Sequence, residues 1–354
     1  MHTSDDSTPS CCAAGRAQLG DAPDASPGES APPAPAEGNK DSSPADGGAA
    51  GSTPETSAAE RRADHPLASF AAPVDATRSR ADRAILIPAG PFRMGTEDRD
   101  RNPLDAESPI REVQVDAFRI DPTCVTNAEF AAFVEETGYV TEAEEFGWSY
   151  VFGALLEPAV RRSSPKPPGT PWWRAVHGAY WDCPEGPGTS VEDRADHPVV
   201  HVSARDAKAF ASWCGMRLPR EAEWEKAARG GLDQARYAWG DELTPDGEHR
   251  CNIWQGSFPV RNTVEDGWLG TAPVRSFSPN GYGLYEVAGN VWEWCSDTWD
   301  AGRAPSMSGD VRVIRGGSYL CHDSYCNRYR VAARHASAVE DASGNKGFRL
   351  AVDA

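Results

Sequence analysis

The amino-acid sequence predicts an α+β fold with little regular secondary structure. Short apolar segments with the two-residue period of strands alternate with short helical patterns that begin at capping residues. Between them lie long stretches rich in Gly, Pro, Trp and Asn, in which neither period persists. Loops longer than about 12 to 15 residues are uncommon in compact domains unless they carry function or are held by more than backbone ladders. Buried tryptophans and bound metal ions are the candidates for holding them.

The first strands are expected near residue 84. Residues 84–95 predict a short strand, a turn and a second strand, because apolar residues lie on both sides of the turn signal Pro88-Ala89-Gly90-Pro91. Val113, Val115 and Phe118 follow at roughly alternate spacing and predict one further strand.

Three helices follow, each with a start and a stop signal. The residues Thr126-Asn127-Ala128-Glu129 form a capping box, and Gly138 closes that helix. Ser203 opens a second helix that Gly215 ends. A third helix is expected over residues 219–229, before two consecutive glycines.

The chain divides into a tail and one domain. Across residues 1–66 the large apolar residues are Met1 and Leu19 alone, so this stretch has nothing with which to build a core. All 12 Trp lie beyond it. We therefore expect a disordered low-complexity tail over residues 1–82 and a single folded domain over residues 83–354.

Acidic residues dominate the charge. The 53 Asp and Glu against 35 Lys and Arg give a formal charge of −18, which repels phosphate backbones and anionic lipid headgroups. No run of 18 apolar residues occurs, and the first 30 residues lack the basic and apolar pattern of a secretory signal. We expect neither nucleic acid nor a membrane as a partner, and we expect the protein in the cytoplasm.

The nine cysteines are odd in number and lack the spacing of a disulfide framework, which favours a reducing compartment. Cys321 and Cys326 differ from the others, because they lie close together in a polar, Arg-rich and aromatic segment that would stabilise thiolates. Two soft thiolates on one loop suit copper(I), whereas zinc would require four ligands. A disulfide between the two is the alternative. Four further cysteines have apolar or aromatic neighbours and are interpreted as small buried hydrophobic residues: Cys124, Cys214, Cys251 and Cys295.

Several segments between residue 84 and the C-terminus carry a further signal. They are Met94-Gly95, Val125 to Asn127, His197 to Ser203, Arg217 to Glu225, Asn252 to Gly256, Asn280 to Leu284 and Gly289 to Trp294. Together they resemble those of the formylglycine-generating enzymes, also known as sulfatase-modifying factors. A wider superfamily shares most of them, including iron-dependent sulfoxide synthases and binding proteins without catalysis. Cys321 and Cys326 are the discriminating residues, because the aldehyde-forming branch has both in a segment like this one.

The resemblance implies a C-type-lectin-like catalytic domain. It implies an enzyme that converts the cysteine of a C-x-P-x-R motif in an unfolded or nascent sulfatase to Cα-formylglycine, with molecular oxygen and a thiol reductant. The substrate thiol would join Cys321 and Cys326 as a third sulfur ligand of copper(I). We expect a monomer. Two alternatives stay open: a metal-free dithiol oxygenase of the same substrate, and a lectin-like peptide-binding protein without catalysis.

Five further residues match positions around the thiol pair in the family. Ser318 and Asn345 are expected to hydrogen-bond oxygen species or water, and Tyr325 to orient a thiolate or donate a proton. Arg334 is expected to supply positive charge that favours thiolates, with the alternative that it is a surface ion-pair partner. Trp292 matches an aromatic wall of the pocket, with the alternative that it belongs to the core.

The resemblance also implies two calcium loops, whose oxygen ligands without sulfur suit that ion. In the first loop the expected ligands are the side chains of Asn252 and Asp266 and the carbonyls of Ile253 and Trp268. In the second they are the carboxylates of Glu286 and Glu293 and the carbonyls of Gly289 and Val291. The alternative is that Asn252 and Glu293 only cap turns.

Some positions depart from the family pattern. Trp148 stands where some members have Asp, so we expect cation-π contact to hold the arginine of the substrate motif. Val331 and Leu350 replace structural cysteines of secreted members, which supports a cytoplasmic bacterial form. In the tail, residues 12–16 read C-x-A-x-R and suggest self-modification, with a chance match as the alternative.

Overall fold

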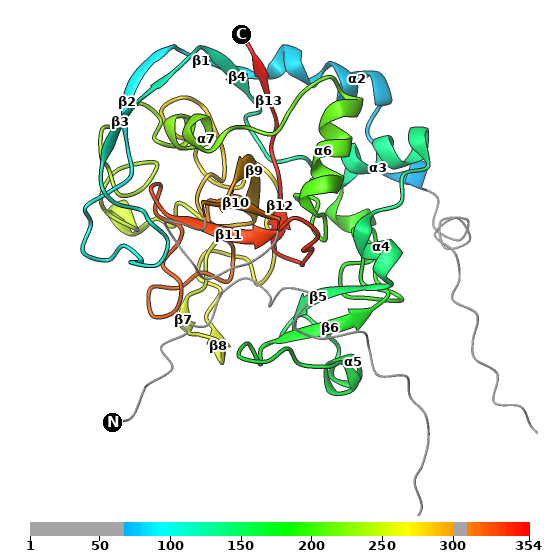
Figure 1. Cartoon of the computed structure of the whole chain (residues 1–354). Helices are drawn as coiled ribbons and strands as arrows, with labels where there is room; N and C mark the ends of the chain where they lie inside the picture. The colour runs from blue at the N-terminus through cyan, green and yellow to red at the C-terminus, as the bar shows by residue number, and fades with distance from the viewer. Residues whose placement is uncertain (1–66, 301–309) are drawn as a thin grey trace, which may run out of the picture.

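The computed structural model describes residues 67–300 and 310–354, and Figure 1 shows its arrangement. The helices are η2 (Leu67–Ser69), α2 (Val74–Arg78), η3 (Ser79–Arg83), α3 (Asn127–Thr137), α4 (Glu142–Phe146), α5 (Pro158–Ser163), η4 (Glu192–Arg194), α6 (Ala204–Trp213), α7 (Glu221–Ala228) and η5 (Pro245–Gly247). The strands are β1 (Ile85–Ile87), β2 (Gly90–Met94), β3 (Arg111–Val115), β4 (Phe118–Ile120), β5 (Trp148–Phe152), β6 (Trp173–His177), β7 (Gly256–Ser257), β8 (Arg261–Asn262), β9 (Trp292–Thr298), β10 (Val311–Arg315), β11 (Arg334–Ala338), β12 (Lys346–Gly347) and β13 (Ala351–Asp353). The expectation of an α+β fold with sparse regular structure is confirmed.

Four strands form a sheet with the order β11-β10-β9-β12. This sheet lies in the middle of the molecule in Figure 1. Strand β10 runs antiparallel to both β9 and β11, while β12 is parallel to β9. Arg315 at the end of β10 therefore lies opposite Glu293 near the start of β9 and opposite Arg334 at the start of β11. Lys346 at the start of β12 lies opposite Trp292. The loop between β10 and β11 and the residue before β12 thus meet at the same end of this sheet.

The predicted single strand around residue 115 is two strands. Strand β3 pairs with β2, whereas β4 joins β1 and β13 in a three-stranded sheet. The pattern contains the reason, because Val113 and Val115 share one face of a strand and Phe118 falls out of that alternation. The two-residue break lets both Val115 and Phe118 be buried.

Helix α3 forms where its capping signals predict it. The hydroxyl of Thr126 accepts from the backbone N–H of Glu129, whose carboxylate accepts from the N–H of Thr126 in return. Gly138 ends the helix with φ 66°. The buried face packs on α6, where the ring of Phe130 lies 5.8 Å from that of Phe210. The predicted helices near residues 203 and 219 are likewise confirmed as α6 and α7.

The folded domain begins earlier than the expected boundary at residue 83. Residues 67–83 form η2, α2 and η3, and Leu67 is buried. Arg80 is 1% exposed and pairs with Asp121 at 2.8 Å and with Glu129 at 3.1 Å. A buried ion pair therefore helps to attach the segment, together with the apolar contact of Leu67 with the core.

Two remaining expectations concern the ends and surfaces of the chain. The residues from Cys12 to Arg16, and the rest of the predicted tail up to residue 66, lie outside the described residues. Among the described residues, none of the helices has the length and apolar character needed to cross a bilayer.

Candidate active site

Cys321 and Cys326 lie between β10 and β11, in residues 317–328, which we call the thiol loop. Their side chains are 0% and 5% exposed, and both belong to one hydrophobic cluster. The carbonyl of His322 accepts hydrogen bonds from the backbone N–H groups of residues 325–327, so the chain turns back on itself between the cysteines. Both are thiols. The loop therefore brings the two predicted copper ligands into the same part of the core.

Ser318 and Asn345 lie beside Cys321 in a chain of buried hydrogen bonds. The side-chain N–H of Asn345 donates to Oγ of Ser318 over 3.0 Å, and the hydroxyl of Ser343 donates to Oδ1 of Asn345 over 2.8 Å. The backbone N–H of Ser318 donates to Sγ of Cys321 at 3.4 Å, which restricts the position of that sulfur atom. Two predicted site residues thus come together with one of the thiols. The sequence analysis missed Ser343, whose only local signal is its place two residues before Asn345.

Tyr325 belongs to a half-buried aromatic cluster at the thiol loop. Its ring stacks on Phe258 with centroids 4.5 Å apart, and Trp172 meets it edge-on at 4.9 Å. These contacts restrict the orientation of the phenol ring. Trp292 is fully buried at the start of β9, and its Nε1 has no hydrogen-bond partner among the described residues. Its role as a wall of the site stays a prediction.

Arg334 lies in a buried ion pair. Its Nε and Nη2 donate to the two carboxylate oxygens of Glu221 over 2.5 and 2.8 Å, and its guanidinium lies 4.2 Å from the ring centroid of Trp299. These contacts match the alternative in which Arg334 is an ion-pair partner, although the pair is buried rather than at the surface. Its predicted effect on the thiols stays a prediction.

The segment before β3 contacts the thiol loop, and the sequence analysis missed it. Oδ2 of Asp105 accepts from Nε of Arg328 over 2.5 Å, and Glu107 pairs with Arg330 at 2.6 Å. Burial acts to raise the pKa of Asp105, but its hydrogen bond with His335 and the charge of Arg328 lower it to about 2. No local pattern could have revealed this contact, because 223 residues separate the partners.

The donors at the thiol loop fit copper(I). Sulfur donors suit this soft ion, although both thiols are buried in an apolar cluster rather than in the polar surroundings that the sequence indicates. Within the described part of the chain, no group of three or more His, Cys, Asp and Glu side chains could hold a metal ion. A pair of thiols would match the low coordination number that copper(I) accepts.

The first predicted calcium loop also fits its ion. Asn252 is fully buried, and its Oδ1 accepts no hydrogen bond within the described residues. Asp266 accepts from the backbone N–H groups of Ile253 and Trp268 and from the side-chain amide of Gln255. All three donors are neutral. Within the described residues, the Oδ1 of Asn252 is thus a buried acceptor without a partner, and a hard cation would satisfy it together with the half-exposed carboxylate of Asp266.

The second predicted calcium loop fits the ion poorly. Glu293 is 0% exposed, and its Oε2 already accepts from Nε of Arg349 over 2.6 Å and from Nε1 of Trp224 over 2.7 Å. Nη2 of Arg349 donates to Oε1 over 2.8 Å. The protein therefore supplies its own cation at this carboxylate. Burial raises the pKa of Glu286, against the lowering effect of backbone N–H bonds from residues 275 and 277.

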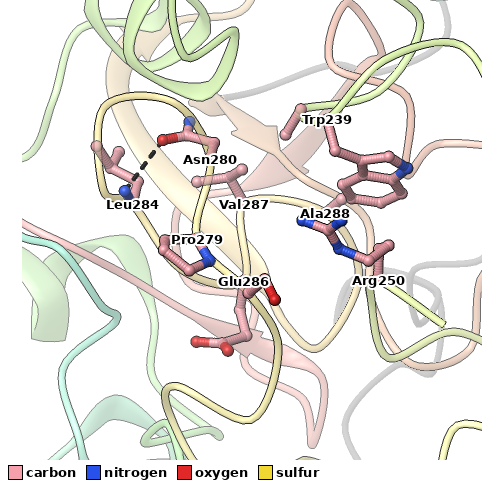
Figure 2. A pocket seen from close by; sticks show the side chains of 10 residues that line it. Trp239, Arg250, Pro279, Asn280, Leu284, Glu286, Val287 and Ala288 are labelled. Atoms are coloured by element: carbon pink, nitrogen blue, oxygen red, sulfur yellow. Dashed lines mark hydrogen bonds between the residues drawn. The ribbon is translucent and has the colours of Figure 1, made fainter. Parts of the chain in front are cut away.

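Two cavities lie near predicted residues but contain neither thiol. One is lined by Glu286 together with Trp239 and Arg250, and Figure 2 shows the Glu286 carboxylate pointing away from those two side chains. The other, of about 190 Å³, has Tyr319 and Gly344 in its wall. These two residues adjoin Ser318 and Asn345 in the sequence.

The remaining predicted positions are apolar or aromatic contacts. Trp148 begins β5 and meets Tyr150 edge-on at 5.0 Å, and its contact with a substrate arginine stays a prediction. Val331 and Leu350 are buried core residues. The interpretation of four cysteines as small buried hydrophobic residues is confirmed, and burial raises the pKa of each thiol: Cys124, Cys214, Cys251 and Cys295.

Comparisons with known proteins show the family of this chain. A family model for the sulfatase-modifying factor enzyme 1-like domain matches residues 69–354. The chain is 56% identical over 301 residues to a formylglycine-generating enzyme of Thermomonospora curvata, covering 81% of this chain and 99% of that protein. It is 45% identical over 274 residues to the inactive C-alpha-formylglycine-generating enzyme 2 of Mus musculus, covering 76% and 85%. The solved structure of PvdO from Pseudomonas aeruginosa matches with TM-score 0.54 and 25% identity, covering 76% and 93%.

The likeness to PvdO concerns the fold. The family model matches almost all of the described residues. It begins at residue 69, the last residue of η2, and continues to the C-terminus. It includes the thiol loop and every other described residue that the site uses. The chain therefore belongs to the family of sulfatase-modifying factor enzyme 1-like proteins.

Proposed function

We propose that this protein converts the cysteine of a C-x-P-x-R motif in unfolded or nascent sulfatases to Cα-formylglycine. The reaction uses molecular oxygen, copper(I) held by Cys321 and Cys326, and a thiol reductant. The observation that carries the proposal is the pair of buried thiols on the thiol loop, in a chain 56% identical to a formylglycine-generating enzyme. We place the activity in the cytoplasm of a bacterium, with the protein acting as a monomer.

The protein supplies orientation, and bound copper(I) supplies the redox chemistry with oxygen. Cys321 and Cys326 bind the ion, and the backbone N–H of Ser318 restricts the position of the Cys321 sulfur. Oγ of Ser318 accepts from Asn345 and from the N–H of Leu320. Because both contacts use its lone pairs, the hydroxyl hydrogen of Ser318 stays available to donate to water or to an oxygen species.

The aromatic cluster at Tyr325 gives the substrate a route of approach. Tyr325 adjoins Cys326, and its ring and those of Trp172 and Phe258 are half-buried, so they present apolar surface to a bound peptide. A peptide that covers this surface excludes water from the thiols, and polar interactions strengthen in such an environment.

The calcium ion belongs to the first loop in this proposal. Asn252 and Asp266 supply side-chain oxygens, and Ile253 and Trp268 supply carbonyls. The buried Oδ1 of Asn252 supports this choice. The ion would hold an irregular loop in place and has no part in the redox chemistry.

Mass analysis of a C-x-P-x-R peptide tests the activity. The copper-loaded wild type should yield the mass of formylglycine and a product that reacts with an aldehyde probe. Cys321→Ser and Cys326→Ser should each lower the rate by roughly 100-fold or more, because each removes a metal ligand. Cys183→Ser is the matched control, since Cys183 is half-buried and donates to the carbonyl of Gly178, a contact that serine retains.

Two results would contradict the proposal in different ways. If wild type binds the peptide without changing its mass, the protein is a peptide-binding protein without catalysis. A mouse relative of this chain is named as inactive. Full activity after stringent removal of copper from reduced protein indicates that the thiols act without a metal.

A further inference from the structure

The thiol loop closes at a crossing of two backbone segments. Gly317 has φ 74°, and a Cβ placed on it would lie 2.9 Å from the carbonyl oxygen of Arg328 and 3.0 Å from the backbone N of Tyr329. Only glycine allows this close approach together with this backbone conformation. The residues at the two ends of the loop therefore touch, and the segment between them carries Ser318, both thiols and Tyr325.

Asp105 holds one side of this crossing. Its Oδ2 accepts from Nε of Arg328 over 2.5 Å, and the two side chains are 4% and 6% exposed. The same arginine contacts Gly317 through its carbonyl oxygen. The side chain of Arg328 is therefore held by a carboxylate from a distant segment. The main chain of Arg328 lies at the crossing where the loop closes.

Further contacts tie the Asp105 segment to the end of the loop. The side-chain amide of Asn327 donates to the carbonyl of Asp100 over 3.3 Å. Nη1 of Arg334, beyond the loop, donates to the carbonyl of Asp105 over 3.3 Å. The Asp105 segment thus contacts Asn327 and Arg328, which follow Cys326 by one and two positions, and also Arg334 beyond the loop.

We propose that Asp105 is a positioning residue for the two thiols, acting through Arg328 and the Gly317 crossing. When the carboxylate of Asp105 is removed, the buried guanidinium of Arg328 loses that acceptor and moves toward other acceptors or water. Its backbone leaves Gly317, and the loop opens at its base. Cys326 lies two residues from Arg328 and Ser318 lies one residue from Gly317, so both sides of the copper site shift. The catalytic consequence rests on the proposed function, whereas the closure of the loop does not.

The test compares Asp105→Asn with Asp121→Asn. Asp121 is an equally buried carboxylate that pairs with Arg80, at 0% and 1% exposure, in another part of the domain. Three properties are measured: the iodoacetamide alkylation rates of Cys321 and Cys326 by peptide mapping, copper(I) affinity by competition with a chelator, and the free energy of unfolding in urea. Both variants should lose stability. Only Asp105→Asn should weaken copper(I) binding, by roughly 10- to 100-fold, and raise alkylation of the two thiols by about tenfold or more.

Equal alkylation rates and copper(I) affinities in the two variants would overturn the proposal. Where Asp105→Asn does not fold, Arg328→Lys provides the same comparison, because it keeps the charge but loses the planar donor that meets Asp105. Thiols as protected in that variant as in wild type would also overturn it. The alkylation and copper(I) measurements do not require turnover. A wild type that makes no formylglycine would therefore refute the proposed function, while the alkylation rates would still decide whether Asp105 closes the loop.

Discussion

The two loops predicted to hold calcium differ in how the protein balances their negative charge. In the loop with Asp266, the carboxylate accepts from neutral N–H groups, and the Oδ1 of Asn252 is buried without a partner in the described part of the chain. In the loop with Glu293, a guanidinium from Arg349 meets both carboxylate oxygens. Similar sequence patterns therefore lead to different sites. The deciding factor is whether the fold brings a cation of its own.

The largest effect is expected from Arg349→Met. This substitution leaves Glu293 buried without its cation, which typically costs about 3 to 5 kcal/mol. Urea unfolding measures the loss. Arg93→Met is the control, because its partner Asp233 lies at the surface and little stability should change. A loss in Arg349→Met no larger than in the control would break the contrast between the loops.

A smaller effect is expected from calcium. Addition of calcium to chelator-treated wild type should raise the free energy of unfolding by about 2.7 kcal/mol at a 100-fold excess over the dissociation constant. Asp266→Asn should abolish this gain, whereas Glu286→Gln in the other loop should keep it. If the gain survives in Asp266→Asn and disappears in Glu286→Gln, the assignment of the ion is reversed.

The smallest effect concerns pH. The pKa of Glu286 is raised in the folded protein by burial, so the folded state holds this proton more tightly than the unfolded state does. The stability that protonation contributes is complete below the ordinary glutamate pKa of about 4.3 and is lost as pH rises through the folded pKa. The stability of wild type relative to Glu286→Gln should therefore fall across that window. A difference that rises with pH there would indicate that a cation compensates Glu286.

Local signals account for the features that were predicted correctly. Helix α3 was predicted because Thr126 and Glu129 complete their hydrogen bonds within one turn of the chain. The thiol pair was predicted because five positions separate Cys321 from Cys326 and a family motif surrounds them. In both instances the groups concerned are close in sequence, so a local pattern indicates that they share one helix end or one loop, while the role of the thiols stays a prediction.

Contacts between distant segments account for what was missed. Asp105 reaches Arg328 across 223 positions, and Arg349 reaches Glu293 across 56. Neither acid differs in its local pattern from an acid that faces solvent. The start of the domain was placed too late partly for the same reason, since Arg80 reaches its partner Asp121 across a long stretch of chain.

The order of residues alone established the capped helices, the scarcity of regular structure and the pair of thiols on one loop. Tertiary structure alone decided which carboxylates have a guanidinium beside them and which buried oxygen has no donor. The physical reason is the strong dependence of electrostatic energy on distance and burial. A charge or a lone pair acquires its partners only when segments far apart in the chain pack together and exclude water.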